Sequence, residues 1–167
     1  YLLVADVLVK EKQYDLALRY LESAYAQEYN ENILDKMAII LYVNLKKEED
    51  ALAILESHSR VHGISKPVAL RLLGFYSEQN SIEGLLATYK RLYALEKDEE
   101  IAKKIVQVYT YKRDYMSLTN FLEESKSDDA LLLQLYSAAK NYKKAYPLAD
   151  ALYEQTADMS YLGQSAI

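Results

Sequence analysis

The chain has 167 residues, of which 51% are hydrophobic and 27% are charged, and none of them is Cys. This composition excludes intrinsic disorder, a disulfide-stapled fold and any site that requires a thiolate, whether a cysteine nucleophile or a metal centre. The net charge is −5 at pH 7 and no apolar run is long enough to span a membrane, so we expect neither a nucleic-acid partner nor direct membrane insertion.

Residues recur along the chain at one period. The segment YDLALRYLES, which begins at Tyr14, returns 34 residues later as EEDALAILES. A third version, YMSLTNFLE, begins at Tyr115, about three periods after the first. A further series is spaced 34, 33 and 27 residues apart and consists of Tyr42, Tyr76, Tyr109 and Tyr136. A fixed period of this length is typical of a repeat architecture.

Each repeat predicts two amphipathic helices. Apolar residues with helical spacing are Tyr1, Val4, Ala5 and Leu8 in the first helix and Tyr14, Ala17, Leu18, Leu21 and Ala24 in the second. No stretch alternates with a period of two, so we expect no strands. The turn and capping residues that separate the helices are Asn30 to Asn32, Gly63, Ser65 to Pro67, Asn80 and Ser81, Asp98, and Ser127 to Asp129.

These signals predict about ten helices and the start of an eleventh at 160–167. We expect one all-α, right-handed superhelical solenoid of about five helical hairpins, with repeats at about 1–29, 30–63, 64–97, 98–126 and 127–157 and part of a sixth at 158–167. Because the first residue is Tyr1 rather than Met, we expect the sequence to be part of a longer chain. The sequence leaves the cellular compartment open.

The fifth repeat is irregular. Pro147 lies inside the expected helix 142–153, where a proline costs about 3 kcal/mol, so this helix either starts near Lys144 or kinks. The spacing of 27 residues before Tyr136 predicts a shortened first helix or a shortened loop in this repeat.

The recurring residues resemble the tetratricopeptide repeat across essentially the whole chain. The aromatic slot of the family's first helix is filled by the four tyrosines of the series, with Leu8 in its place in the first repeat. The small slot of the second helix falls on Ala17, Ala51 and Ala145, with Leu85 and Leu118 elsewhere. The large apolar slot one turn later falls on Leu21, Leu55, Tyr89 and Leu122, with Ala149 in the fifth repeat.

Two features depart from this family's pattern. Where the family places a small residue at the helix crossing, Ala5 fits, but the other repeats carry Ile39, Leu73, Val106 and Leu133. The closing proline is replaced by Tyr29, Gly63 and Lys97. We therefore expect wider helix spacing than in a consensus repeat, and a related helical-hairpin solenoid remains an alternative.

The resemblance implies a non-enzymatic scaffold that binds a protein or peptide in a concave groove lined by the first helices. The groove positions of the first three repeats fall on Leu2, Asp6, Val9, Lys36, Ile40, Val43, Leu70, Arg71, Gly74 and Ser77. Those of the last two repeats fall on Lys103, Gln107, Thr110, Ala130, Gln134 and Ser137. An equally weighted interpretation places Ile40, Val43 and Leu70 in the core. Gly74 suggests close approach by a ligand or by a neighbouring helix.

Two other functions remain open. The chain could be a structural spacer or self-association module that stacks end to end through Tyr161, Leu162 and the first hairpin, or a helical domain attached to an enzyme. A clamp for a chaperone's C-terminal tail is rejected because Ile40 stands where that clamp needs Asn. Lys36, Arg71 and Lys103 still favour an acidic ligand.

We expect no metal, cofactor or catalytic centre. His58 and His62 have the i, i+4 spacing of a helical metal pair, but the sequence offers no third ligand beside them. Ser57 and Ser59 flank His58, yet neighbouring residues on a helix diverge, so no nucleophile–base pair is predicted. Most of the 17 tyrosines are expected to pack at repeat slots rather than to stack on nucleic-acid bases.

Overall fold

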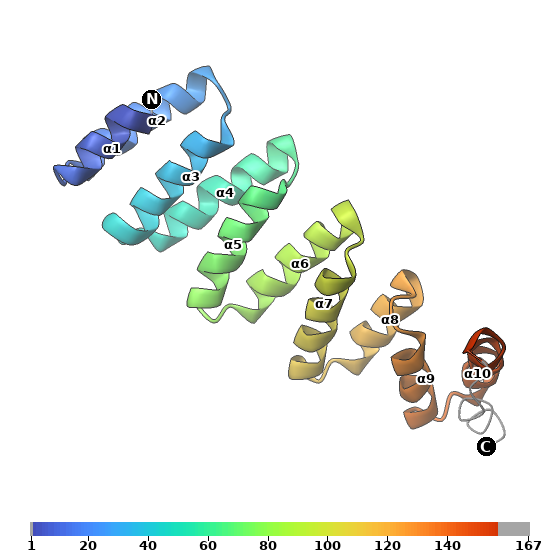
Figure 1. Ribbon diagram of the computed structural model, residues 1–167. Coiled ribbons are helices and arrows are strands. Elements are labelled where there is room, and N and C mark those ends of the chain that lie inside the picture. The colour runs from blue at the N-terminus through green and yellow to red at the C-terminus, as the bar shows by residue number, and fades with distance from the viewer. Residues whose placement is uncertain (1, 157–167) are drawn as a thin grey trace. The chain divides into compact units, whose positions relative to one another are not determined.

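The computed structural model describes residues 2–156, which form ten α-helices and one π-helical segment, with no strand among them (Figure 1). The chain divides into two compact units, 1–97 and 98–167. The first unit contains α1 (Leu2–Lys10), α2 (Tyr14–Gln27), α3 (Glu31–Ile39), the π-helical segment η1 (Ile40–Asn44), α4 (Glu48–His62), α5 (Lys66–Glu78) and α6 (Ile82–Glu96). The second contains α7 (Glu99–Lys112), α8 (Tyr115–Ser125), α9 (Asp129–Ala138) and α10 (Tyr142–Thr156).

The first unit is built from helical hairpins. Helices joined by a short turn pack together in three pairs, α1 with α2, α3 with α4 and α5 with α6. Contacts between successive hairpins connect them, because α3 of the second hairpin packs on α2 of the first and on α5 of the third. The expected all-α, helix-turn-helix architecture is confirmed.

The small and large apolar slots of α2 and α4 lie in the core of the first unit, whereas Leu85 and Tyr89 in α6 are half-buried. Ala17 and Ala51 are fully buried, and Leu21 and Leu55 are at most 1% exposed. A first cluster joins α1, α2, α3 and η1 through Ala5, Ala17, Leu21, Ala24, Ile33, Met37 and Ile40. A second joins α3, η1, α4 and α5 through Leu34, Ala38, Leu41, Tyr42, Ala51, Leu55, Val68, Leu72 and Phe75. The ring of Tyr42 stacks on Phe75 at a centroid distance of 4.0 Å.

In the second unit the same slots are buried. The buried side chains include Ala102, Ile105, Tyr109, Leu118, Leu122, Leu132, Leu133, Tyr136, Ala145 and Ala149.

The crossing slot is half-buried at Ile39, Leu73 and Val106. Small buried residues lie instead one turn earlier in two helices, at Ala69 in α5 and Ala102 in α7, which the sequence did not indicate.

Polar side chains cap the helices where the sequence predicted helix starts. Side-chain oxygens accept the hydrogen bond of a backbone N–H in the first turn at Asn30, Ser65, Ser81, Asp98 and Asp128. Gly63 ends α4 with a φ of +79°, as predicted. Glycine is needed at Gly84 for a different reason. A Cβ there would lie 2.3 Å from the Tyr76 ring, so the absence of a side chain lets α6 approach α5 closely.

The turns that follow the first helices repeat one backbone motif without glycine. Lys12, Asn80, Arg113 and Lys140 have φ between 54° and 60°. The next residue donates its N–H to the aromatic-slot carbonyl at 2.8–3.0 Å, on Leu8, Tyr76, Tyr109 and Tyr136. This is a Schellman closure. The α3–α4 turn differs because it follows the π-helical segment η1. There the N–H of Leu45 donates a hydrogen bond to the carbonyl of Ile40, and the N–H of Lys47 donates one to the carbonyl of Leu41.

The fifth repeat is irregular, as predicted. α10 starts at Tyr142 rather than near Lys144, and Pro147 lies inside it. α9 has 10 residues against 14 in α7, which confirms the shortened first helix. The helix before it is also short, because α8 has 11 residues against 15 in α6. The expected eleventh helix, Tyr161 and Leu162 lie outside the described residues.

Candidate functional site

The predicted groove residues of the first unit lie on α1, α3, η1 and α5. Val43 and Leu70 are 51% and 55% exposed, so the interpretation that placed them in the core is wrong. Gly74 and Ser77 are also exposed. Leu2, Asp6, Val9, Lys36 and Arg71 are half-buried.

Ile40 is the exception. It is only 1% exposed and belongs to the cluster formed with α1 and α2, so it does not line an open groove. The α1–α2 hairpin covers this position, which periodicity within α3 alone does not reveal. A Cβ added at Gly74 would meet nothing within 4 Å, so no neighbouring helix of the described chain requires glycine there.

Ion pairs hold the basic side chains of this face. Lys36 Nζ lies 2.6 Å from Asp6 Oδ1 and links α3 to α1. The Arg71 guanidinium donates two hydrogen bonds to Asp35, from Nε at 2.6 Å and from Nη2 at 3.0 Å, and links α5 to α3. Each of these two cations therefore already has a carboxylate partner within the chain.

A cavity of about 370 Å³ lies between α3 and α5 on the groove face. Its apolar wall includes Leu55, Val68 and Leu70, and its polar rim includes Asp35 and Arg71. The Arg71–Asp35 pair therefore lines the same hollow as the exposed Leu70 side chain.

The predicted groove residues of the second unit lie on α7 and α9. Lys103, Gln107, Thr110 and Gln134 are exposed, and Ala130 and Ser137 are half-buried. A cavity of about 310 Å³ is lined by Lys103 and Gln107 together with Ser127 and Asp128. Lys103 Nζ lies 3.1 Å from Glu100 Oε1, so this third basic residue is also paired.

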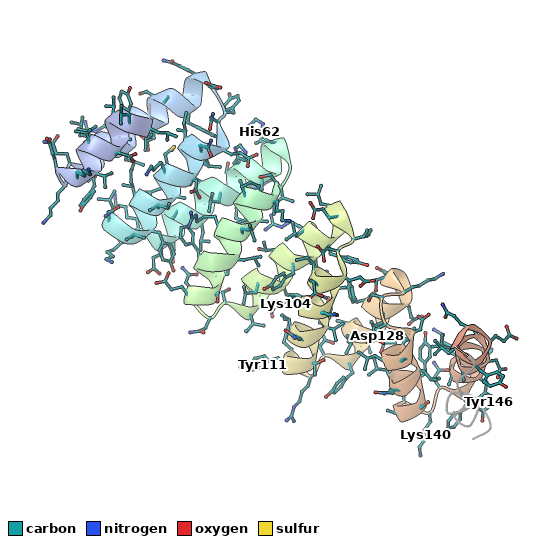
Figure 2. The ribbon with its side chains drawn as sticks, in the orientation of Figure 1. His62, Lys104, Tyr111, Asp128, Lys140 and Tyr146 are labelled. Atoms are coloured by element: carbon teal, nitrogen blue, oxygen red, sulfur yellow. The ribbon has the colours of Figure 1, made fainter. Side chains whose placement is uncertain are left out.

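A larger cavity, of about 660 Å³, opens where α2, α3 and α4 meet. We call it the tyrosine–histidine cavity. Its lining consists of Glu22, Tyr25, Tyr29, Leu34, Met37, Ala53, Ile54, Ser57, His58, Val61 and His62. Figure 2 marks His62 at the C-terminal end of α4. None of the predicted groove residues lines this cavity.

Four rings form one wall of the tyrosine–histidine cavity. Centroids lie 5.5 Å apart for Tyr25 and Tyr29, 4.8 Å for Tyr29 and His62, 4.7 Å for His62 and His58, and 5.8 Å for His58 and Tyr25. Burial and the neighbouring His62 lower the pKa of His58, and burial raises the pKa of Tyr25. Neutral His58 can therefore accept the Tyr25 O–H at Nδ1, over 2.5 Å.

His58 is therefore buried against Tyr25, whereas His62 lies beside it at the surface. Residues 2–156 contain no group of three or more His, Cys, Asp or Glu side chains placed to hold a metal ion. Among those same residues, no helix is long and apolar enough to cross a membrane.

Comparison with known proteins gives the fold. No protein-family model and no curated protein matches the sequence. A crystal structure of a tetratricopeptide repeat protein from Parabacteroides merdae matches over 97% of this chain and 68% of that one, with 18% identity and a TM-score of 0.51. The chain has a tetratricopeptide-like repeat fold.

Two further structures match this tetratricopeptide-like chain. A MamA RS-1 double mutant is 14% identical, over 93% of this chain and 94% of that one, with a TM-score of 0.49. The C-terminal part of a repeat-containing protein from Cytophaga hutchinsonii is 16% identical, over 93% and 65%, with a TM-score of 0.44.

The tetratricopeptide-like repeat also explains why the sequence did not reveal the larger cavity. One repeat apart, the position of His58 is filled by Ala24 and Leu92, both buried apolar residues. A histidine in an apolar slot was the available signal, but the cavity itself depends on how three helices meet.

Proposed function

We propose that the chain is a non-enzymatic protein-interaction scaffold that binds a polypeptide segment on the face formed by α1, α3 and α5. The observation that carries this proposal is Leu70, which is 55% exposed at the edge of the 370 Å³ cavity. A bulky apolar side chain of a partner would bury Leu70 together with the cavity wall, since apolar contact area supplies most of the free energy of association.

Two features of this face support a preorganised site. The Asp6–Lys36 and Asp35–Arg71 pairs link three successive first helices, and the buried clusters beneath them set the spacing between these helices before a partner arrives. Exposed Val43 supplies a second apolar contact from η1. A surface that needs little rearrangement loses less conformational entropy on binding.

Affinity capture from a native extract tests the proposal with two matched variants. Leu70→Asp places a charge on the proposed face, and Leu95→Asp places one on α6 at a leucine that is also 55% exposed. We expect wild type and Leu95→Asp to retain the same protein and Leu70→Asp to lose it, with equal helicity by circular dichroism. Equal capture by all three folded proteins would contradict the proposed face.

A second candidate function is self-association through the exposed side of α1. Val4 and Val7 are 45% and 50% exposed, whereas the residues two repeats later, Leu72 and Phe75, are 0% and 5% exposed. α1 therefore presents apolar side chains at slots that are buried within the fold elsewhere. Exposed apolar side chains gathered on one side of a helix are typical of a surface that another chain covers.

Sedimentation equilibrium distinguishes this candidate from the first. Self-association predicts a mass that rises with concentration in the wild type and remains monomeric in a Val4→Lys, Val7→Lys double variant. A wild-type mass that stays monomeric up to high concentration would exclude this candidate and leave the scaffold proposal untouched.

A further inference from the structure

We propose that the tyrosine–histidine cavity is a second binding site, separate from the α1–α3–α5 face, and that it takes a small aromatic amine. The volume of about 660 Å³ lies within the range of small-molecule sites, roughly 300–1,000 Å³. The site belongs mainly to the second helices of two hairpins, α2 and α4, whereas the proposed polypeptide face belongs to first helices.

The interior of the cavity suits an aromatic ring. Leu34, Met37 and Ile54 supply apolar surface, and Met sulfur makes favourable contacts with aromatic rings. Tyr25, Tyr29, His58 and His62 supply ring surface along one wall, where a further ring can stack. A ligand ring would extend this wall without displacing any charged group.

The polar groups of the cavity define the rest of the ligand. His58 already accepts a hydrogen bond from Tyr25, so these two groups orient each other and we do not assign them to hydrogen bonds with a ligand. Ser57 and His62 remain at the surface and can exchange hydrogen bonds with a ligand.

Charge decides between a cationic and an anionic ligand. Among the lining side chains, Glu22 is the only Asp, Glu, Lys or Arg. It is exposed, and no ion pair engages it among the described residues. An ammonium group attached to the bound ring would pair with this carboxylate, whereas a carboxylate there would be repelled.

Two probes with the same ring and opposite charge test the proposal directly. Tryptamine carries an indole and an ammonium, and indole-3-propionate carries the same indole and a carboxylate. Because the chain contains no Trp, indole fluorescence reports on the probe alone. We expect saturable binding of tryptamine to the full chain at pH 7.5, about fivefold or more tighter than indole-3-propionate.

Matched variants locate the binding. Ala53→Phe fills the cavity from α4, while Ala87→Phe makes the same change one repeat later, at an exposed position of α6 outside this cavity. Tryptamine affinity should fall at least about tenfold in Ala53→Phe and stay unchanged in Ala87→Phe. Glu22→Gln should bring the affinities for the two probes together.

Three results would overturn the proposal. These are no saturable binding of tryptamine, equal affinity for both probes in the wild type, and unchanged affinity in Ala53→Phe when circular dichroism shows a folded variant. None of them bears on polypeptide capture through Leu70, so the two proposals fail separately.

Discussion

Leu55 is the residue on which the packing of the first unit most directly depends. It lies in the large apolar slot of α4, is 1% exposed and packs in the cluster that joins α3, α4 and α5. Leu55→Ala should lower the free energy of unfolding by about 2–5 kcal/mol, because it removes buried methyl groups and leaves a cavity.

Urea denaturation followed by circular dichroism measures this effect. Leu70→Ala is the matched control, since it removes the same atoms from an exposed position of α5 and should change stability by less than about 1 kcal/mol. A loss below about 1 kcal/mol for Leu55→Ala would mean that the repeat register is wrong.

His58 is the residue at which protonation and packing are coupled. Tyr25 from α2, His62 from α4 and Glu31 at the start of α3 influence it, and burial is the largest cause of its lowered pKa. The unfolded chain protonates this histidine near its ordinary pKa of 6.5, while the folded chain protonates it at lower pH. As the pH falls through 6.5 the unfolded state binds more protons, so stability falls.

His58→Leu should flatten this pH dependence, since leucine is the residue that the next repeat carries at the same slot, Leu92. Thermal unfolding between pH 7.5 and 5 measures it, with His62→Gln as the variant that keeps the buried imidazole. We expect a smaller loss of melting temperature in His58→Leu than in the wild type. A parallel loss in both proteins would contradict the assigned role of His58.

Left-handed residues close the turns after four of the first helices. Arg113 follows α7 with a φ of 57°, a conformation that costs a non-glycine residue about 1–2 kcal/mol. Arg113→Gly should therefore raise the free energy of unfolding by about 0.5–1 kcal/mol, after allowing for the added flexibility of the unfolded chain.

The control is the same replacement inside the same helix. Lys104 is an exposed residue in the middle of α7, and Lys104→Gly should lower stability by about 0.5–1 kcal/mol. Chemical denaturation of the two variants should thus give opposite signs. A loss of stability in both would show that the left-handed conformation of Arg113 carries no net cost.

Pro147 interrupts the backbone hydrogen bonds of α10. It has no N–H to donate to the carbonyl of Lys143, one turn back in the helix. Pro147→Ala restores this donor at an exposed position and should raise the free energy of unfolding by about 1–3 kcal/mol. Unchanged or lower stability by denaturant unfolding would show that the helix gains nothing from the restored bond.

Sequence predicted those elements whose causes are local. Helix starts at Asn30, Ser65 and Asp98 follow from capping chemistry within three residues of the chain, so they could be inferred directly. The left-handed turns at Lys12 and Arg113 could not, because no glycine marks them and the repeat's closure imposes their conformation.

The candidate sites could not be predicted in the same way, because they depend on contacts between residues that are distant in the sequence. The exposure of Leu70 was one of two interpretations that its spacing allowed, and the burial of Ile40 follows from the α1–α2 hairpin that lies over it. The tyrosine–histidine cavity needs residues from α2, α3 and α4 together, which no single helical pattern contains.

At the scale of the whole molecule, repetition both stabilises the fold and creates its surfaces. Each compact unit buries the apolar faces of its hairpins against their neighbours, and the first helices of each unit leave other side chains exposed. We propose that the exposed side of α1, α3 and α5 is the surface that a polypeptide partner occupies.

Site-specific photo-cross-linking tests this claim most directly. A photoreactive phenylalanine analogue replaces Leu70 in one protein and the equally exposed Leu95 in another, and both are irradiated in a native extract. We predict one dominant polypeptide adduct from position 70 and none of that mass from position 95. An adduct from position 95 alone, or no adduct from position 70 in a folded protein, would contradict the claim.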